Sequence, residues 1–542
     1  MTTTQARSAV LDSEHVGDIR GALGTIRLED TASRRGKSAA LKTLLAIVGP
    51  GLIVMVGDND AGAFATYGQA GQNYGTHLLW TLLLLVPVLY VNQEMVLRLG
   101  AVTGVGHARL ILERFGRFWG AFSVIDLFLL NALTIITEFI GITLAAGYLG
   151  LPRAVSVALA AAVVVGSAFT GSFRRFERMA MAFCGASLLL IPVYLFSHPH
   201  ASQMAQGFAV PQLPGGSGQL STVMLLIIGI VGTTIAPWQL FFQQSYVIDK
   251  RITPRFMKYE KADLGIGIVI VVIGAAALMG ATAAAFAGTG GFGRFTDAAG
   301  LAHGLAASGG RAAGVLFAIA LLDASVIGAF AVSLSTAYAI GDVFGLKHSL
   351  HRGVKGAKGF YAIYAGLVVA AAAVVLIPGS PLGLLTEGVQ VLAGVLLPSA
   401  TVFLLLLCND RAVLGPWVNG RMTNLFTSVV VAVLVTLSVV LTASVLFPAI
   451  TAGQIAVILA GCAAASVLVA GLAMARRLRP GSPASLPIDR TGRSGWRMPP
   501  LTLLDRPVMS TGRKLGMSAL RLYLAVAMIL VIVRIVELAA VH

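Results

Sequence analysis

Charged residues are scarce in this sequence. Asp, Glu, Lys and Arg make up 11% of its 542 residues and apolar residues make up 57%, whereas soluble domains carry about 25% charged and roughly 45–50% apolar residues. The mean hydropathy is +0.85, which excludes an ordinary soluble protein. Because one helical crossing needs about 20 apolar residues, the chain has room for about a dozen membrane spans.

Cysteine is almost absent. The three cysteines, Cys184, Cys408 and Cys462, are far apart and each lies inside an apolar run, which excludes a disulfide or zinc framework. The sequence also lacks an HExxH motif, a phosphate-binding glycine loop and a combined nucleophile, base and orienting residue, so we expect neither enzymatic activity nor a bound cofactor. The first forty residues contain no apolar run and do not resemble a cleaved signal peptide.

Long apolar stretches separated by short polar or Gly/Pro-rich loops predict thirteen membrane spans in an all-α polytopic membrane protein. Arg534 and Glu537 in the last stretch are also compatible with an amphipathic helix on the membrane surface, which would leave twelve spans. The expected spans cover residues 43–74, 76–97, 118–149, 152–170, 177–197, 220–248, 262–288, 312–343, 359–378, 383–408, 424–448, 452–475 and 517–541.

Basic residues favour one side of this arrangement. There are 39 Lys and Arg residues against 23 Asp and Glu, an excess that in a soluble protein would suggest a nucleic acid partner. With the N-terminus in the cytoplasm, 35 of the 39 basic residues fall in the tails and loops of the inner side, as the positive-inside rule requires. We therefore expect a multi-pass protein of the inner (plasma) membrane with a cytoplasmic N-terminus. Its partner is expected to be the lipid bilayer and not a nucleic acid, and we expect the protein to be a monomer.

Two predicted spans are interrupted by residues that weaken a helix. The first carries Gly57-Asp58-Asn59-Asp60-Ala61-Gly62, and the sixth carries Gly232-Thr233-Thr234-Ile235-Ala236-Pro237-Trp238. Carboxylates at membrane depth usually face a cavity or a ligand, and proline removes a hydrogen-bond donor from the helix. Interruptions five spans apart are typical of inverted repeats that form a midplane substrate site. The alternative is a pair of ordinary kinks in packed helices.

Several sequence blocks carry a family resemblance. GPGLIVMVGDNDAGAFATYGQAGQNYGTHLLW begins at Gly49, RLGAVTG covers 98–104, TEFIG covers 137–141, and CNDRAVLGPWVNGR begins at Cys408. In this order the blocks resemble the Nramp family of divalent-metal transporters, over about residues 45–450. The resemblance implies a LeuT-like inverted repeat of five plus five helices, followed by two or three C-terminal helices.

Span positions and the resemblance together give the expected domain organisation. A basic cytoplasmic tail, expected to be disordered, precedes an inverted-repeat core, two additional spans, a basic loop also expected to be disordered, and a C-terminal helix. The corresponding residues are 1–42, 43–408 (first repeat 43–197, second repeat 220–408), 409–475, 476–515 and 516–542.

The resemblance also implies a metal site, with departures from the family pattern. In the family, an aspartate and an asparagine of the first span, backbone carbonyls at both breaks and the methionine of a Met-Pro-His motif hold the ion. By position, Asp60 keeps the carboxylate, Gly57 and Thr233 keep the carbonyls, Ala63 replaces the asparagine, Ala236 replaces the methionine, and Trp238 replaces the histidine.

Loss of the soft thioether removes a preference for softer transition metals, since hard oxygen ligands suit Mg²⁺, Ca²⁺ and Mn²⁺. Two alanines also leave room for an ion that keeps some of its water. This pattern resembles the Nramp-related magnesium transporters. The expected ligands are Asp60, the carbonyls of Gly57 and Thr233, water, and some of Asp58, Asn59, Thr234 and Gln390.

Proton coupling is weakly supported by the same comparison. Coupled members of the family carry histidines on the sixth span and an Asp-x-x-Glu pair on the third, where this chain has Trp238, Gln243, Ile135 and Glu138. Only Glu138 remains titratable, so we expect uncoupled or weakly coupled uptake. Asp323 in the eighth span either lines the inner vestibule or has a structural partner.

The function expected is therefore secondary transport of Mg²⁺ and/or Mn²⁺ into the cytoplasm by alternating access, with the ion as substrate and no cofactor. Two alternatives remain. One is a proton-coupled Mn²⁺/Fe²⁺ symporter. The other is an amino-acid or organic-solute carrier of the same fold, which acidic residues at the break disfavour because helix N-termini would then bind a substrate carboxylate.

Overall fold

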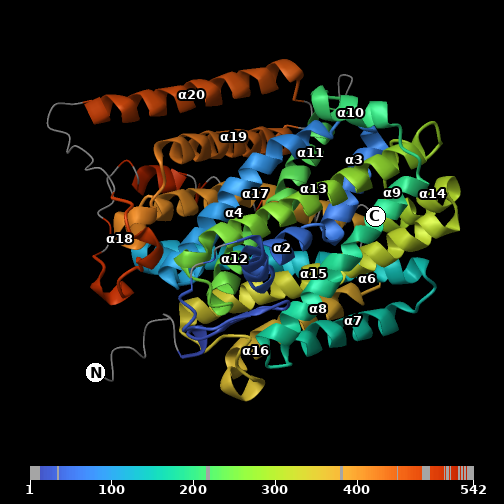
Figure 1. Cartoon of the computed structure of the whole chain (residues 1–542). Coiled ribbons are helices and arrows are strands. Elements are labelled where there is room, and N and C mark those ends of the chain that lie inside the picture. Colours follow the sequence, from blue (N-terminus) through green and yellow to red (C-terminus); the bar gives the residue numbers. More distant parts are fainter. Residues whose placement is uncertain are drawn as a thin grey trace.

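The computed structural model describes residues 13–505, except 33, 35, 215–219, 379–381, 448–449 and 479–488, together with scattered positions between 507 and 533. The described residues are mainly helical (Figure 1). Their only strands, β1 (Ile19–Arg20) and β2 (Thr25–Ile26), form a short antiparallel pair. The expected all-α fold is confirmed.

Ten helices or helix pairs in the described residues are long and apolar enough to cross a membrane. Each of the first twelve predicted spans contains a helix, and most of the thirteenth lies outside the described residues. The long helices are α4 (Trp80–Thr103), α6 (Arg117–Tyr148), α8 (Phe173–Ala186) with α9 (Leu190–Phe196), α11 (Leu220–Thr234) with α12 (Pro237–Asp249), α13 (Met257–Phe286), α15 (Arg311–Phe344), α16 (Lys358–Val375), α17 (Leu382–Cys408), α19 (Arg421–Leu446) and α20 (Ala452–Leu478).

A sharp bend lies near the start of the first predicted span. Helix α1 (Lys37–Ile47) meets α2 (Pro50–Val56) at an angle of 54°. The bend is local: Gly49 has a φ of 156°, and Pro50 disfavours helical geometry in the residue before it. The predicted span 43–74 thus contains the end of α1, then α2, and then α3 (Ala61–Tyr74).

The other helices are shorter. Helix α7 (Arg153–Ala168) is apolar and lies in the fourth predicted span. The remaining helices are α5 (His107–Phe115), α10 (Ala201–Ala209), α14 (Ala298–Gly309) and α18 (Arg411–Leu414), with 3₁₀ turns η2 (Ser13–His15), η3 (Ser187–Leu189), η4 (Pro254–Phe256), η5 (Val354–Gly356), η6 (Gly415–Trp417), η7 (Arg493–Gly495) and η8 (Leu501–Leu503).

The packing of the helices has the symmetry of an inverted repeat. Helices α2 and α3 of the first span pack on α13 of the seventh, and α12 of the sixth packs on α4 of the second. Helices α6 and α15, the third and eighth spans, pack along each other. Exchanging every span with the one five places away reproduces these contacts, as two related halves require. In Figure 1, α19 and α20 lie together at one side of this core.

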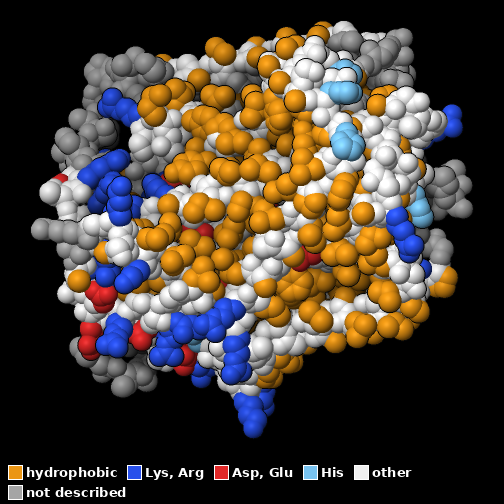
Figure 2. Space-filling model, turned by 45° about the vertical axis from the view of Figure 1, so that its right-hand side comes forward, with side chains coloured by type: hydrophobic (Ala, Val, Ile, Leu, Met, Phe, Trp, Pro, Cys, Tyr) orange, Lys and Arg blue, Asp and Glu red, His pale blue; other side chains and the backbone are white. Residues whose placement is uncertain are grey.

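The basic loops meet at one end of the bundle. The guanidinium of Arg98 donates to the carbonyl of Trp417, Arg251 donates to that of Glu14 (2.8 Å), and Arg497 donates to that of Ala101. Figure 2 shows Lys and Arg side chains gathered at the left and lower edges beside a largely hydrophobic surface. We call this end, formed by residues 13–36, 249–261, 345–358, 409–421 and 489–505, the basic face.

The N-terminal tail differs from the expected disordered segment 1–42, because residues 13–32 are folded and contact α8. Ile19 and Ile26 of the strand pair are buried. Glu177, which pairs with Lys250 (2.7 Å), also accepts from the backbone N–H of Ala22 (2.5 Å). The burial of Ile19 and Ile26 and the hydrogen bond from Ala22 to Glu177 thus hold the tail in place.

The loop 476–515, also expected to be disordered, is folded over residues 489–505. The indole N–H of Trp417 donates to the carbonyl of Arg493 (2.7 Å), and the N–H of Met498 donates to that of Val102 (3.3 Å). These contacts with η6 and the end of α4 hold the segment.

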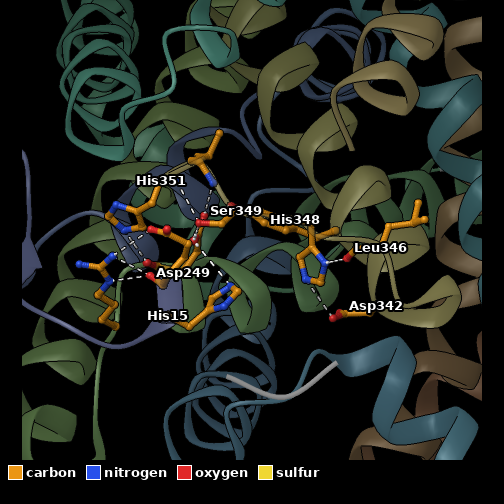
Figure 3. Close-up of polar contacts among 11 residues, drawn as sticks. His15, Asp249, Asp342, Leu346, His348, Ser349 and His351 are labelled. Atoms are coloured by element: carbon orange, nitrogen blue, oxygen red, sulfur yellow. Dashed lines mark hydrogen bonds and ion pairs between the residues drawn. The ribbon is translucent and has the colours of Figure 1, made fainter. Parts of the chain in front are cut away.

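Asp249, the last residue of α12, joins three segments of the basic face (Figure 3). Its carboxylate accepts from Tyr338 Oη (2.5 Å), Ser349 Oγ (2.5 Å) and the N–H of Leu350 (2.8 Å). His15 of the tail lies 3.8 Å from the same carboxylate. The end of the broken sixth span is thereby attached to α15, to the following loop and to the tail.

His348 adds a pH-dependent contact beside this group. Its Nε2 lies 3.2 Å from Asp342 Oδ1, and His15, Tyr338 and Phe360 pack around its ring. Burial lowers the pKa of His348, but the negative charge of Asp342 and its hydrogen bond outweigh burial and raise the pKa to about 9.

The substitution His348→Gln tests this contact. Because the folded-state pKa lies above the unfolded value of about 6.5, the contact contributes on the order of 3 kcal/mol below pH 6.5 and loses it as pH rises through about 9. We expect a lower melting temperature than wild type at pH 6 in detergent, and convergence of the two near pH 10. A difference of equal size at both pH values would contradict the assignment.

Candidate functional site

Both predicted helix breaks are present. In the first span α2 ends at Val56 and α3 begins at Ala61, and in the sixth α11 ends at Thr234 and α12 begins at Pro237. The ends of α3 and α11 pack against each other, and α2 packs on α12. The two breaks therefore face one another inside the bundle.

Each break removes one helical hydrogen bond from a carbonyl that the sequence singled out. In a continuous helix the N–H of Ala61 would donate to Gly57 and that of residue 237 to Thr233. The N–H of Ala61 instead donates to Glu138 Oε2 (3.2 Å), and Pro237 has no N–H. The carbonyls of Gly57 and Thr233 are thus deprived of their usual donors at equivalent positions.

Asp60 lies at the start of α3. Its Oδ1 accepts from the N–H of Ala63 (2.9 Å), and its side chain lies against Gly328 together with the carboxyl group of Glu138 on α6. Gly328 on α15 permits this pairing, because a Cβ there would lie 2.7 Å from the Glu138 carboxyl group. Sequence reasoning missed Gly328.

Asp58 faces the sixth span. Its Oδ1 accepts from Nε2 of Gln239 on α12, and Oε1 of Gln239 accepts from Gln93 on α4 (2.8 Å). Nε2 of Gln239 also lies 3.4 Å from the carbonyl of Thr234. Gln239 and Gln93 were missed, although an amide two residues after the break proline was a signal that the sequence contained.

The other polar candidates border the same breaks. Thr234 Oγ1 is 2.7 Å from Tyr67 Oη, and the amide of Gln390 on α17 lies so close to Gly62 that a Cβ would overlap it. Among the described residues, Thr233 Oγ1 and Gln390 Nε2 are buried and have no hydrogen-bond partner. Both groups are available to a ligand.

The side chains at the three positions that depart from the family pattern, Ala63, Ala236 and Trp238, are buried. The ring of Trp238 lies against Gly57, at 3.6 Å from where a Cβ would be. Ser335 Oγ donates to the carbonyl of Trp238 (2.8 Å). The indole ring of Trp238 therefore lies beside the first break, at Gly57.

Two candidates point elsewhere. Asn59 Nδ2 donates to the carbonyl of Val271 on α13 (3.2 Å). Asp323 lies on α15, five residues or about 7.5 Å of helix before Gly328, and within the described residues it forms no ion pair. Of the two structural alternatives for Asp323, an arginine partner is not found among the described residues, and a neutral carboxyl group held by hydrogen bonds stays a prediction.

The buried carboxyl groups at the breaks form no ion pairs with other described residues. Asp58, Asp60 and Glu138 are at most 3% exposed, and the ion pairs of the described residues include none of them. An unpaired charge at membrane depth is costly. No three His, Cys, Asp or Glu side chains of the described part converge as a complete metal site, so any cation there would need carbonyl, amide or water oxygens as well.

Two broken helices that face each other within an inverted-repeat bundle define a polytopic membrane protein with a buried polar site between its halves. The sequence profile described as "Natural resistance-associated macrophage protein-like" matches residues 51–444. The chain belongs to this family, Nramp, and the fold is the LeuT-like inverted repeat.

Curated relatives are named as transporters and not as enzymes. The chain is 30% identical over 401 residues to "Divalent metal cation transporter MntH" of Ralstonia nicotianae, covering 71% of this chain and 87% of the relative. It is 27% identical over 438 residues to the protein of the same name from Pectobacterium carotovorum subsp. carotovorum, covering 77% and 97%.

A solved structure has the same fold. The manganese transporter of Eremococcus coleocola, in complex with an aromatic bis-isothiourea substituted compound, superposes with a TM-score of 0.62 at 21% identity, covering 82% of this chain and 97% of that one.

The close approach of Gln390 to Gly62 can be tested by stability. Gly62→Ala should lower the melting temperature because the methyl group overlaps the Gln390 amide. In Gly62→Ala/Gln390→Ala the overlap is gone, so the double variant should lose less than the sum of the single losses, with a coupling of about 0.5–3 kcal/mol. Gly185→Ala, at a helical position with nothing within 4 Å, is the control. Additive losses would show that the two groups are not in contact.

Proposed function

We propose that the chain is a secondary transporter that moves a divalent cation, Mg²⁺ and/or Mn²⁺, across the membrane by alternating access. The observation that carries this proposal is the set of buried carboxyl groups at the breaks, which form no ion pair with any described Lys or Arg side chain. A divalent cation would neutralise them. The printed names of the curated relatives, divalent metal cation transporters, support the same substrate class.

The ligand set proposed consists of hard oxygen atoms. Asp60 and the carbonyls of Gly57 and Thr233 form its centre, because each break deprives its carbonyl of a donor. Asp58, Asn59, Thr234 and Gln390 are further candidates. Asp58 is held by Gln239 in the present arrangement, and Asn59 would have to turn away from α13.

The replacement of two family ligands by alanine favours a hard and partly hydrated ion. Neither Ala63 nor Ala236 offers a side-chain donor, and carboxylate, carbonyl and water suit Mg²⁺ and Mn²⁺. Mg²⁺ dehydrates reluctantly and usually keeps several waters. This reasoning supports the magnesium-transporting branch of the family over transport of softer metals.

We place the basic face in the cytoplasm, following the positive-inside rule. Uptake then carries the cation toward the negative side of the membrane, and each elementary charge gains about 2.3 kcal/mol per 100 mV. The buried breaks would have to open to each side in turn, with the attachment of α12 to the tail and to α15 released when the basic face opens.

One observation favours the second candidate, a proton-coupled Mn²⁺/Fe²⁺ symporter. The side chains of Asp60 and Glu138 both lie against Gly328, and a proton on one of the two carboxyl groups would relieve the repulsion between two buried negative charges. A cation that binds Asp60 would displace this proton. Metal-dependent acidification of liposomes at fixed stoichiometry would identify coupled transport, and its absence would support uncoupled uptake.

Uptake into proteoliposomes tests the central residue. Mg²⁺ and Mn²⁺ uptake should fall by about a hundredfold or more in Asp60→Ala, since loss of even an outer-shell partner costs roughly 10–100-fold in metal affinity. Asp126→Asn, a buried acid on α6 away from the breaks, is the matched control and should retain uptake. Unchanged uptake in Asp60→Ala would refute the proposed site.

Ala236→Met tests selectivity. A thioether at the start of α12 should shift the preference from Mg²⁺ toward Mn²⁺ and Fe²⁺, because sulfur suits softer ions. Ala236→Leu adds similar bulk without sulfur and serves as the control. If competition assays give both variants the same selectivity, the volume of the side chain and not the thioether determines it.

A further inference from the structure

A second cavity lies at the basic face, away from the helix breaks. It has a volume of about 640 Å³ and lies between α4, the turn η4 with the start of α13, the turn η6 with the start of α19, and the segment at η7. Its basic lining residues are Arg98, Arg255, Lys258, Lys261, Arg490 and Arg493.

The cavity has a large excess of positive charge. Glu94 is its only acidic lining residue, and it is already paired with Arg98 (3.0 Å) and Lys261 (2.7 Å). Within the described part of the chain, no carboxylate lies within 4 Å of Lys258, Arg490 or Arg493. Three cations around one cavity therefore lack a counter-charge from the protein.

Aromatic contacts hold two of these cations at the cavity. Arg493 stacks on the ring of Trp417, with Cζ 4.7 Å from the centroid, and Lys258 Nζ lies 4.8 Å from that of Tyr259. Trp417 is itself tied to Arg98 and to the carbonyl of Arg493. The positive groups are thus positioned by neighbouring contacts before any anion binds.

The opposite wall is apolar and extends toward the membrane. Tyr90 and Val91 of α4 line the cavity together with Met257 and Val418. Tyr90 precedes Arg98 by eight residues, about 12 Å along the helix, and is 37% exposed on a candidate membrane span. The cavity therefore joins a cationic mouth to an apolar wall.

We propose that this cavity binds the phosphate headgroup of an anionic phospholipid, with an acyl chain along the Tyr90 side of α4. Arg and Lys are the side chains that recognise phosphate, and basic pockets between transmembrane helices bind anionic headgroups. A free phosphate would contact only the cationic mouth. The inference is independent of metal transport and depends on the proposed function only for the leaflet, which is the cytoplasmic one.

Thermal stability and native mass spectrometry of the full chain in detergent test this inference. Phosphatidylglycerol should raise the melting temperature and give a lipid-bound species, whereas phosphatidylcholine and inorganic phosphate should not. In Lys258→Gln/Arg490→Gln/Arg493→Gln the affinity for phosphatidylglycerol should fall on the order of a hundredfold, at about 1 kcal/mol per basic residue. Lys347→Gln/Lys355→Gln/Lys358→Gln removes the same charge from another loop of the basic face and should bind like wild type.

Three results would overturn the proposal. Equal effects of phosphatidylcholine would show that the headgroup charge is not recognised. An equal stabilisation by inorganic phosphate would identify a soluble anion as the ligand. Equal losses in the two triple variants would reveal general attraction to the basic face. The first two comparisons use wild-type protein, so they stand even if the cavity variant does not fold.

Discussion

At each of the two helix breaks, one backbone carbonyl lacks the hydrogen bond that a continuous helix would provide. The rest of the structure depends on enclosing these two carbonyls. The carbonyl of Gly57 loses its donor because Ala61 turns to Glu138, and that of Thr233 loses its donor because Pro237 has none. Lipid cannot satisfy such groups, so both breaks must lie inside protein. The surrounding helices accordingly bury Asp58 and Asp60 with them, and this enclosed group of oxygen atoms is what a cation would recognise.

Close packing around the breaks follows from this requirement. Gly328 admits the Glu138 carboxyl group beside Asp60, and Gly62 admits the Gln390 amide. Gln239 connects Asp58 to Gln93 and thereby joins the first, sixth and second spans. A ligand that draws on Asp58 and Asp60 must compete with Gln239 and Glu138, so cation binding is coupled to the positions of the helices that carry them. In the transport mechanism proposed above, this coupling is what would link cation binding to alternating access.

The basic face has a structural role beside the cytoplasmic placement proposed for it. Arg98, Arg251 and Arg497 bind carbonyls of distant segments, and Lys250 forms a fully buried pair with Glu177. The tail and the loop at η7 are ordered by these contacts. Cationic side chains without an ion-pair partner among the described residues line the cavity between α4, α13 and α19, and the apolar wall beside them is why lipid phosphate is proposed as their counter-charge.

The sequence by itself predicted both breaks and the apolar stretches that hold the first twelve predicted spans, because apolar length and the helix-weakening Gly57 and Pro237 act locally. It also contained Asp58, Asp60 and Thr234 at the breaks, whereas Gln390 came from the family resemblance. Gln239, Gln93 and Gly328 were missed, as was the folding of the tail around Ile19 and Glu177. Only the tertiary structure decided these contacts, because they depend on which faces of distant helices meet. The periodicity of one helix does not specify which helices will be its neighbours.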